Sequence, residues 1–191
     1  NIVAVVVTYN RIELLKKGIS CLRKQSALSS IIVVNNGSND GTYEWLGQQS
    51  DLKVIHQDNV GGSCGSYAGI KTAYHDGAAW ISCMNDDVFP LPDCLDNLLS
   101  CVNRSEVGIV MPRRLLNGKI FTHEFQQFDF VHPLASMHGR KLSKQQVNDV
   151  TEIVGADFEG PLISRKVVEQ IGLPNKDLFI FCDDTDYCLR A

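Results

Sequence analysis

Apolar positions follow two alternating patterns along this chain. Residues 2–8 are apolar at almost every position and rich in valine, which is typical of a strand buried on both faces. In residues 12–24 the apolar positions recur every three or four residues, as on one side of a helix. The patterns repeat and predict further strands at 31–34, 53–57 and 80–84, and helices at 42–49, from the loop 58–69 to about 76, and at 93–102. This order predicts an α/β fold in which helices cover a mostly parallel sheet.

The rhythm changes after an apolar run at 107–111. Asn117 and Gly118 stand where a type I′ hairpin turn needs them, and we expect the sheet to become mixed at this point. Residues 122–150 are polar and irregular, with a helix expected near 144–150. Strand and helix patterns return at 152–164 and 165–171, and the closing stretch 179–191 predicts a strand-like apolar run followed by a helix.

The chain has the size of one domain, and we expect a single domain over residues 1–191. Its 44% apolar and 21% charged residues and net charge of -4 give no basic surface for nucleic acid or an anionic membrane. No apolar run approaches the roughly 18 residues that span a bilayer, and the start "NIVAVVVTYNR" lacks the features of a signal peptide. Because the chain starts with Asn and stops inside a predicted helix, we expect a piece of a longer protein, truncated at its C-terminus.

Cysteine and histidine usage points away from disulfides and zinc. The seven cysteines are odd in number and form no C-x-x-C pair, so we expect reduced, mostly buried thiols in a cytoplasmic protein. No histidine pair has a metal-ligand spacing such as H-x-x-x-H, and we assign none of the five histidines to a site.

Unusual polar residues follow the predicted strands. In an open parallel sheet, ligands bind outside the carboxyl ends of the strands. Here those ends carry Thr8-Tyr9-Asn10, Asn35-Asn36-Gly37-Ser38-Asn39-Asp40, a glycine-rich loop, and Asn85-Asp86-Asp87. The sequence therefore predicts a ligand site at this edge of the sheet.

The glycine-rich loop contains Gly61, Gly62, Gly65 and Gly69. Glycines let a backbone approach a phosphate or ribose and aim N–H groups at it from a helix start. Neither G-x-G-x-x-G nor G-K-[ST] is present, so neither a dinucleotide fold nor a P-loop is supported. Tight turning and close helix packing explain the glycines equally well, and both interpretations stay open.

Two groups of carboxylates stand apart from the rest. Asp86 and Asp87 directly follow a strand and could hold Mg²⁺ or Mn²⁺ against substrate phosphates, or could simply cap the turn before Pro90. Asp183 and Asp184 open the last predicted helix, where like charges so close suggest proton handling. The alternative is an acidic first turn opposing the helix dipole.

The combination of motifs is more specific than any one of them. "TYNR" at 8–11, "NNGSNDGT" at 35–42, "NVGGSCG" at 59–65, "NDD" at 85–87 and "DDTDYCLR" at 183–190 together resemble the inverting glycosyltransferases of family 2, which have the GT-A fold. The resemblance covers nearly the whole chain. The wording "NVGGSCGSYAGI", "MNDDVFPLPDCL" and "ADFEG" looks most like the galactofuranosyltransferases, with rhamnosyltransferase-like members close behind.

The resemblance implies a donor half, 1–112, and an acceptor and catalytic half, 113–191. In the donor half it implies a nucleotide-sugar site built from Thr8, Tyr9, Arg11, Asn36, Gly61, Gly62, Ser63 and Asp86. Asp87, with Asp86, would bind a divalent metal, Mn²⁺ or Mg²⁺. Asn85 departs from the three-acid version of this motif, which weakens or removes one metal ligand.

In the second half, the resemblance implies that Asp184, or less favourably Asp183, is the general base that takes the proton of the acceptor hydroxyl. It implies an acceptor site at Asp157, Phe158 and Gly160. The implied activity transfers a sugar from a nucleoside diphosphate donor to a glycan or lipid-linked acceptor in cell-surface polysaccharide synthesis. UDP-galactofuranose is the preferred donor and dTDP-rhamnose the second, and the full-length protein would lie in the cytoplasm or peripherally on the membrane.

Two other functions remain open at this point. A sugar-nucleotide nucleotidyltransferase would share the nucleotide-binding sheet but would need a basic, glycine-rich loop after the first strand, and "TYNRIELL" has neither feature. A non-catalytic nucleotide-sugar or glycan-binding module would keep the glycine loop and have no need of Asp184. The effect of Asp184→Asn on turnover separates this module from an enzyme.

Overall fold

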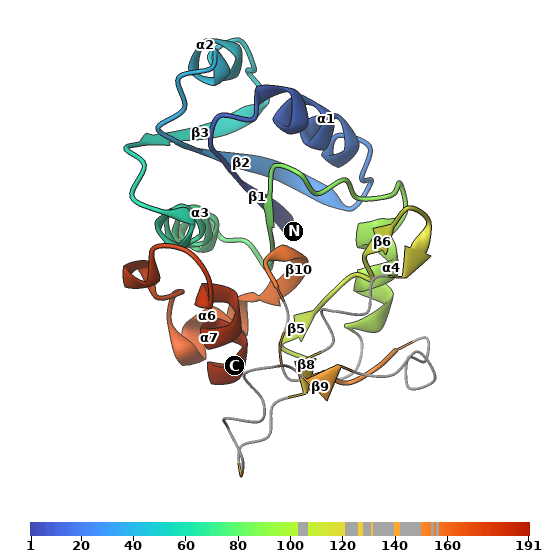
Figure 1. The fold of residues 1–191 in the computed structure, drawn as a ribbon. Helices are drawn as coiled ribbons and strands as arrows, with labels where there is room; N and C mark the ends of the chain where they lie inside the picture. The colour runs from blue at the N-terminus through green and yellow to red at the C-terminus, as the bar shows by residue number, and fades with distance from the viewer. Residues whose placement is uncertain are drawn as a thin grey trace.

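A six-stranded sheet in the order β3-β2-β1-β4-β10-β5 forms the centre of the molecule (Figure 1). The computed structural model describes residues 1–102, 107–120, 126–127, 131, 140–141, 150–153, 155 and 157–191. The strands of this sheet are β1 (Ile2–Thr8), β2 (Leu28–Asn36), β3 (Leu52–Gln57), β4 (Trp80–Asn85), β5 (Ile109–Val110) and β10 (Glu159–Ser164). The first four pair in parallel, which confirms the predicted mostly parallel α/β sheet. The helix predicted near 144–150 lies outside the described residues, apart from its last position.

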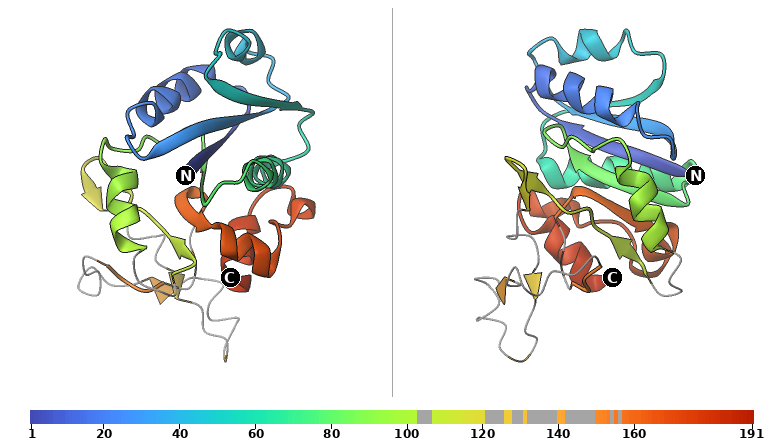
Figure 2. Two further views of the ribbon diagram at one scale, coloured as in Figure 1. Left: turned by 180° about the vertical axis from the view of Figure 1, so that it is seen from behind. Right: turned by 90° about the vertical axis from the view of Figure 1, so that its right-hand side faces the viewer.

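Helices cover both faces of this sheet, as the view in Figure 1 and the rear view in Figure 2 show. The valines of β1 alternate between the faces: Val3 and Val5 pack in one cluster, and Val6 packs in the other. The helices are α1 (Ile12–Leu22), α2 (Thr42–Leu46), α3 (Gly62–His75), α4 (Cys94–Cys101), α6 (Arg165–Ile171), α7 (Asp183–Arg190) and the 3₁₀ helix η2 (Lys176–Leu178). Side chains of α3, α6 and α7 share one core cluster, whereas α1 and α4 pack on the opposite face. Within the described part of the chain, no helix has the length and apolar character to cross a membrane.

The mixed character of the sheet has a different origin from the one expected. The predicted hairpin exists as β6 (Leu115–Leu116) and β7 (Lys119–Ile120), and its turn residues Asn117 and Gly118 both have positive φ, as a type I′ turn requires. This hairpin is a separate two-stranded sheet, like the pair β8 (Gln126–Gln127) and β9 (Arg140–Lys141). The central sheet is mixed because β10 runs antiparallel between β4 and β5.

The prediction of a strand-like run before α7 is wrong. Phe179 and Phe181 have φ of 59° and 69°, and Cys182 is left-handed at 65°, so the chain turns instead of extending. The Phe179, Ile180 and Phe181 side chains are exposed. Apolar content alone predicted a strand here, but no strand among the described residues pairs with this segment, and its backbone contacts α3 instead.

The expectation of mostly buried thiols is also wrong. All seven cysteines are free, as predicted, but Cys83 alone is buried and Cys182 is exposed. The other thiols lie in the first or last turn of a helix and are partly buried.

Candidate active site

The ends of β1 and β4 bring four predicted residues together. The Thr8 hydroxyl donates a hydrogen bond to Asp86 Oδ2 at 2.7 Å, and Asp86 is only 3% exposed. Arg11 Nη1 lies 3.4 Å from Asp86 Oδ1 and 3.0 Å from Asp87 Oδ2. Because β1 and β4 are adjacent parallel strands, residues far apart in the sequence meet at this edge.

These contacts put the carboxylates of Asp86 and Asp87 in different surroundings. Burial raises the pKa of Asp86, while the Thr8 hydrogen bond and Arg11 lower it. Both Asp86 oxygens already contact protein donors, whereas the Asp87 side chain is 46% exposed. Among the described residues, no group of three or more His, Cys, Asp and Glu side chains could hold a metal ion. Asp87 therefore fits a metal bound mainly by water and substrate phosphates, which is the way proteins commonly hold Mg²⁺.

At the end of β2, the predicted base contact Asn36 lies inside the protein. It is 3% exposed, and its Nδ2 donates to Asn59 Oδ1 and to the Gly61 carbonyl, both at 3.1 Å. Gln57 donates to its oxygen at 2.9 Å. The Asn36 side chain thus holds the glycine-rich loop in place, while Tyr9, 46% exposed, is open to a ligand at the same edge.

Packing explains most of the loop glycines. Gly61 has φ of 96°, and a Cβ there would overlap the backbone of Phe179. A Cβ at Gly65 or Gly69 would collide with valine side chains of β1, whereas at Gly62 it would meet nothing within 4 Å. Of the two interpretations left open by the sequence, close packing accounts for all but Gly62, which alone among these four glycines leaves room for a ligand.

The first turn of α3 is also engaged by the segment that precedes α7. The Ser63 N–H donates to the Phe179 carbonyl at 3.1 Å, and Ser63 is fully buried. Its hydroxyl has no hydrogen-bond partner of ordinary geometry in the described structure, but it lies close enough to Asp183 to lower the pKa of that carboxyl. Ser63 and Gly61 therefore connect the loop to the carboxylates of α7.

The α7 carboxylates face different neighbours. Burial, and then the Asp184 charge, raises the pKa of Asp183. Asp184 Oδ1 accepts hydrogen bonds from the Thr185 N–H and hydroxyl at 2.6 and 3.3 Å. Asp186 forms an ion pair with Arg190 at 2.9 Å across one helical turn. Its carboxylate is therefore paired on the surface of α7, as the i,i+4 spacing predicts.

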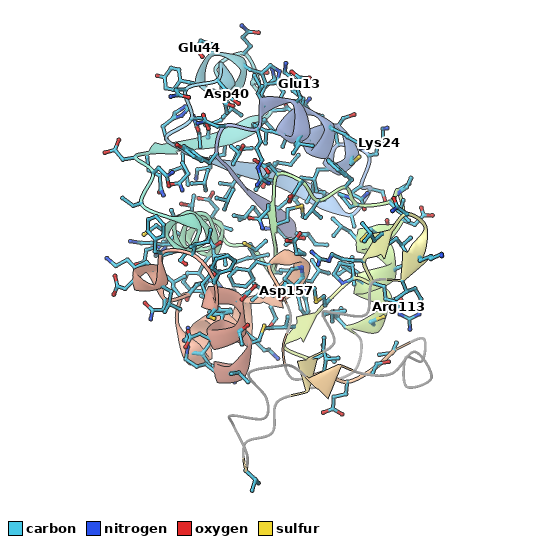
Figure 3. The ribbon with its side chains drawn as sticks, in the orientation of Figure 1. Glu13, Lys24, Asp40, Glu44, Arg113 and Asp157 are labelled. Carbon is cyan, nitrogen blue, oxygen red and sulfur yellow. The ribbon has the colours of Figure 1, made fainter. Side chains whose placement is uncertain are left out.

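The predicted acceptor residues Phe158 and Asp157 also lie in different surroundings. Phe158 is 6% exposed and packs edge-on against Tyr187, so its ring belongs to the core. Burial, and then the charge of Asp184, raises the pKa of Asp157. Figure 3 shows Asp157 at the centre of the molecule near β10, with Arg113 farther out near α4.

A groove of about 1770 Å³ is lined by two of the predicted site residues, Asp87 and Gly160, and not by Asp157 or the α7 carboxylates. Arg114, Glu159 and residues of α4 line it as well. Glu159 was not singled out from the sequence, although an acidic residue between two predicted acceptor positions was a usable signal. Burial raises the pKa of Glu159, and the charges of Asp87 and Asp157 raise it further.

These pKa shifts predict an unusual pH dependence of stability. A carboxyl with a higher pKa in the folded than in the unfolded state contributes stability that is full below its unfolded pKa and is lost as the pH rises through its folded pKa. Asp86, Asp157, Glu159 and Asp183 all shift upward. We therefore expect these four carboxyls to lower the melting temperature as the pH rises above about 4, the usual pKa of a free carboxyl. Asp40 and Asp51, whose pKa values are lowered, act in the opposite direction.

The variant Asp157→Asn tests whether the raised carboxyl pKa values cause this pH dependence. We expect it to raise the melting temperature near neutral pH by about 2–4 °C, the shift that 1 kcal/mol produces at this size, with no gain near pH 4. Differential scanning calorimetry across this pH range measures both. A gain of equal size at both ends would contradict the electrostatic cause, because packing effects do not depend on protonation.

Comparison with known proteins identifies the family of this chain. The model of Glycosyl transferase family 2 matches residues 3–172. The chain belongs to glycosyltransferase family 2. This confirms the resemblance seen in the motifs. The match ends before α7, so the roles of Asp183 and Asp184 remain predictions from the resemblance.

Two curated family 2 relatives are similar in sequence. The undecaprenyl-phosphate mannosyltransferase of Micrococcus luteus is 28% identical over 124 residues, which covers 62% of this chain and 51% of that protein. The galactofuranosyltransferase GlfT1 of Mycolicibacterium smegmatis is 26% identical over 189 residues, covering 96% of this chain and 62% of that protein. The chain thus spans only about half to three fifths of the length of these relatives.

Solved structures show the same fold. The mannosyltransferase PcManGT from Pyrobaculum calidifontis, in complex with GDP-Man and Mn²⁺, aligns with 97% of this chain and 50% of its own at TM-score 0.61 and 17% identity. TarS 1-349 from S. aureus, in complex with UDP, aligns with 98% of this chain and 54% of its own at TM-score 0.69 and 13% identity. These alignments confirm the GT-A fold of this family 2 domain.

Proposed function

We propose that this family 2 domain transfers a sugar from a nucleoside diphosphate donor to a hydroxyl of a glycan or lipid-linked acceptor, with inversion at the anomeric carbon. The observation that carries the proposal is the meeting of Thr8, Arg11, Asp86 and Asp87 at the ends of β1 and β4. A row of carboxylates leads from this cluster. Besides burial, the charges of Asp87 and Asp157 raise the pKa of Glu159. The charge of Asp184 in turn raises the pKa of Asp157. This row connects the metal-compatible end of β4 with the first turn of α7.

The two ends of the row suit the two halves of the reaction. The acceptor oxygen forms a bond to the anomeric carbon while the bond from that carbon to the diphosphate oxygen breaks, and the diphosphate leaves with the electron pair. Asp184 takes the proton of the acceptor hydroxyl. A divalent metal held by Asp87 would neutralise charge on the leaving diphosphate. Arg11, in contact with Asp87, adds a fixed positive charge at the same place.

The donor is proposed from similarity alone. The relatives are named for a mannosyl and a galactofuranosyl transfer, and the aligned structures contain GDP-Man or UDP. The motifs resemble the galactofuranosyltransferases, so UDP-galactofuranose is the first donor to test and dTDP-rhamnose the second. Contacts with one or two hydroxyls decide the specificity between such sugars.

Isothermal titration of UDP and dTDP, with Mn²⁺, with Mg²⁺ and with EDTA, tests the donor site. We expect metal-dependent binding of at least one nucleotide, and we expect Asp87→Ala to weaken it by at least about tenfold. Asp51→Ala is the matched control, since Asp51 is a carboxylate paired with Arg23 before β3 and away from the strand ends. Wild-type affinity in Asp87→Ala, or no nucleotide binding with metal present, would count against the proposal.

A further inference from the structure

The β6–β7 hairpin exposes apolar side chains on both of its faces. Leu115, Leu116 and Ile120 are each between 42% and 60% exposed. Leu115 lies opposite Ile120, and Leu116 lies opposite Lys119. Because neighbouring residues of a strand point to opposite faces, the first pair lies on one face and the second on the other. A hairpin in water keeps polar side chains on its open face, so this hairpin indicates contact with something apolar.

Cations accompany these apolar side chains. Residues 107–120 include Arg113, Arg114 and Lys119 but no aspartate or glutamate. Arg113 and Lys119 are exposed, whereas Arg114 forms an ion pair with Glu159 at 3.3 Å. The net charge of -4 is an average over the whole chain and does not record this local excess of positive charge. Open apolar side chains next to open cations are the combination that binds anionic lipids.

The hairpin borders the groove that Asp87 lines. Both leucines of the hairpin line this groove, and so does the exposed Leu91 between β4 and α4. Two of the acids in the groove are paired, one with Arg11 and one with Arg114. All the acids that line it come from outside the hairpin: Asp87, Asp93, Glu152 and Glu159. A surface bound at the hairpin would therefore lie beside the groove and meet the cations first.

A second exposed apolar group, at residues 179–181 before α7, differs in charge. Each of its side chains is more than half exposed, but Asp183, Asp184 and Asp186 follow directly in the first turn of α7. In Figure 1 the hairpin strand β6 lies at the right-hand edge of the molecule, whereas α7 lies to the lower left. An anionic surface attracts the cations of the hairpin and repels the carboxylates of α7, so charge selects the hairpin.

A second copy of the chain is a poorer partner for the hairpin. In a symmetric dimer the same surface meets itself. Arg113 and Lys119 of both copies would then gather at one contact, where like charges repel. A bilayer of anionic lipids instead presents a continuous surface of phosphates to these cations.

We propose that the β6–β7 hairpin binds the surface of an anionic lipid bilayer. Its three apolar side chains enter the boundary between headgroups and acyl chains, as amphipathic segments do. Arg113 and Lys119 bind lipid phosphates while their alkyl stems lie along the apolar region. Bilayer binding goes beyond the transfer reaction and needs no turnover. Its consequence, that the groove beside Asp87 opens toward lipid-linked acceptors, rests on the proposed function.

Sedimentation of the protein with lipid vesicles tests the proposal. We expect binding to vesicles of phosphatidylcholine with phosphatidylglycerol at least about tenfold tighter than to phosphatidylcholine alone. Leu115→Ser with Leu116→Ser should weaken this binding by at least about tenfold. Arg113→Gln with Lys119→Gln should remove the preference for the anionic vesicles. All four positions are exposed, so the melting temperature should stay near wild type.

Phe181 provides the matched control, because it is exposed and apolar but lies next to the α7 carboxylates. Phe181→Ser should bind the vesicles like wild type. Tryptophan emission reports the location directly: Leu116→Trp should add emission that shifts to shorter wavelength with anionic vesicles, and Phe181→Trp should not. An equal shift in both, or an equal loss of binding in the leucine and Phe181→Ser variants, would overturn the assignment to the hairpin.

The outcomes distinguish this inference from the proposed function. Binding of UDP with Mn²⁺ but not of anionic vesicles overturns the inference and leaves the transferase proposal intact. A dimer that the leucine variant abolishes, without vesicle binding, also overturns it in favour of a second copy. Vesicle binding without any binding of UDP would contradict the proposed function alone.

Discussion

Replacing Asp184 with asparagine is expected to lower kcat by about 10²–10⁴-fold while the affinity for UDP stays within about twofold of wild type. The charge of Asp184 raises the pKa of Asp157, a residue of the proposed acceptor site, whereas the Ser63 hydroxyl of α3 lowers the pKa of Asp183. An amide at position 184 cannot take the proton of the acceptor hydroxyl, but it keeps the size of the side chain. The proposed donor site around Asp86 and Asp87 is not touched.

Two further variants give this prediction its controls. Asp183→Asn should reduce turnover less, because the Asp183 carboxylate is directed at the buried first turn of α3. Asp186→Asn should leave turnover near wild type, since Asp186 forms a surface pair with Arg190 worth about 0.3–0.5 kcal/mol. Release of UDP from a UDP-sugar in the presence of acceptor measures all three. If Asp183→Asn abolished turnover and Asp184→Asn did not, the general base would be Asp183. Unchanged turnover in both would favour the non-catalytic module.

Gly61→Ala is expected to destabilise the protein by about 2–4 kcal/mol and to reduce turnover beyond what partial unfolding explains. Gly61 has φ of 96° and ψ of 160°, a conformation essentially restricted to glycine. A Cβ there would also overlap Phe179, whose carbonyl receives the Ser63 N–H. Displacing Phe179 moves the chain that leads into Asp183 and Asp184, so both stability and catalysis should suffer.

Gly62→Ala is the matched control for this prediction. A Cβ at Gly62 meets nothing within 4 Å, and alanine in the first turn of a helix should be neutral or stabilising by about 0.4–1 kcal/mol. Urea unfolding and turnover at low temperature measure both variants. Wild-type stability of Gly61→Ala would show that the chain before α7 is not held on α3. Weaker UDP binding by Gly62→Ala, at full stability, would indicate that the nucleotide approaches the loop at Gly62.

The sequence by itself determined the architecture and most of the strand ends. The apolar period of residues 2–8 and the strands after it reflects burial on two faces, which is a local property of the chain. The same reasoning located the hairpin at Asn117, because a type I′ turn needs particular residues. It also placed Thr8, Asp86 and Asp87 at one edge, since parallel strands end on the same side.

Only the tertiary structure decided which of these residues are open to a ligand. Asp86 is buried by Thr8, Gly61 is covered by Phe179, and Glu159 is oriented by Asn85, 74 positions away. The apolar run before α7 failed as a strand for the same reason, because its backbone is bound by α3 rather than by a neighbouring strand. Periodicity records whether a position is buried, but not its partner. The partner depends on strand register and on packing between distant segments. These two features decide which side chains of the site are open to a ligand.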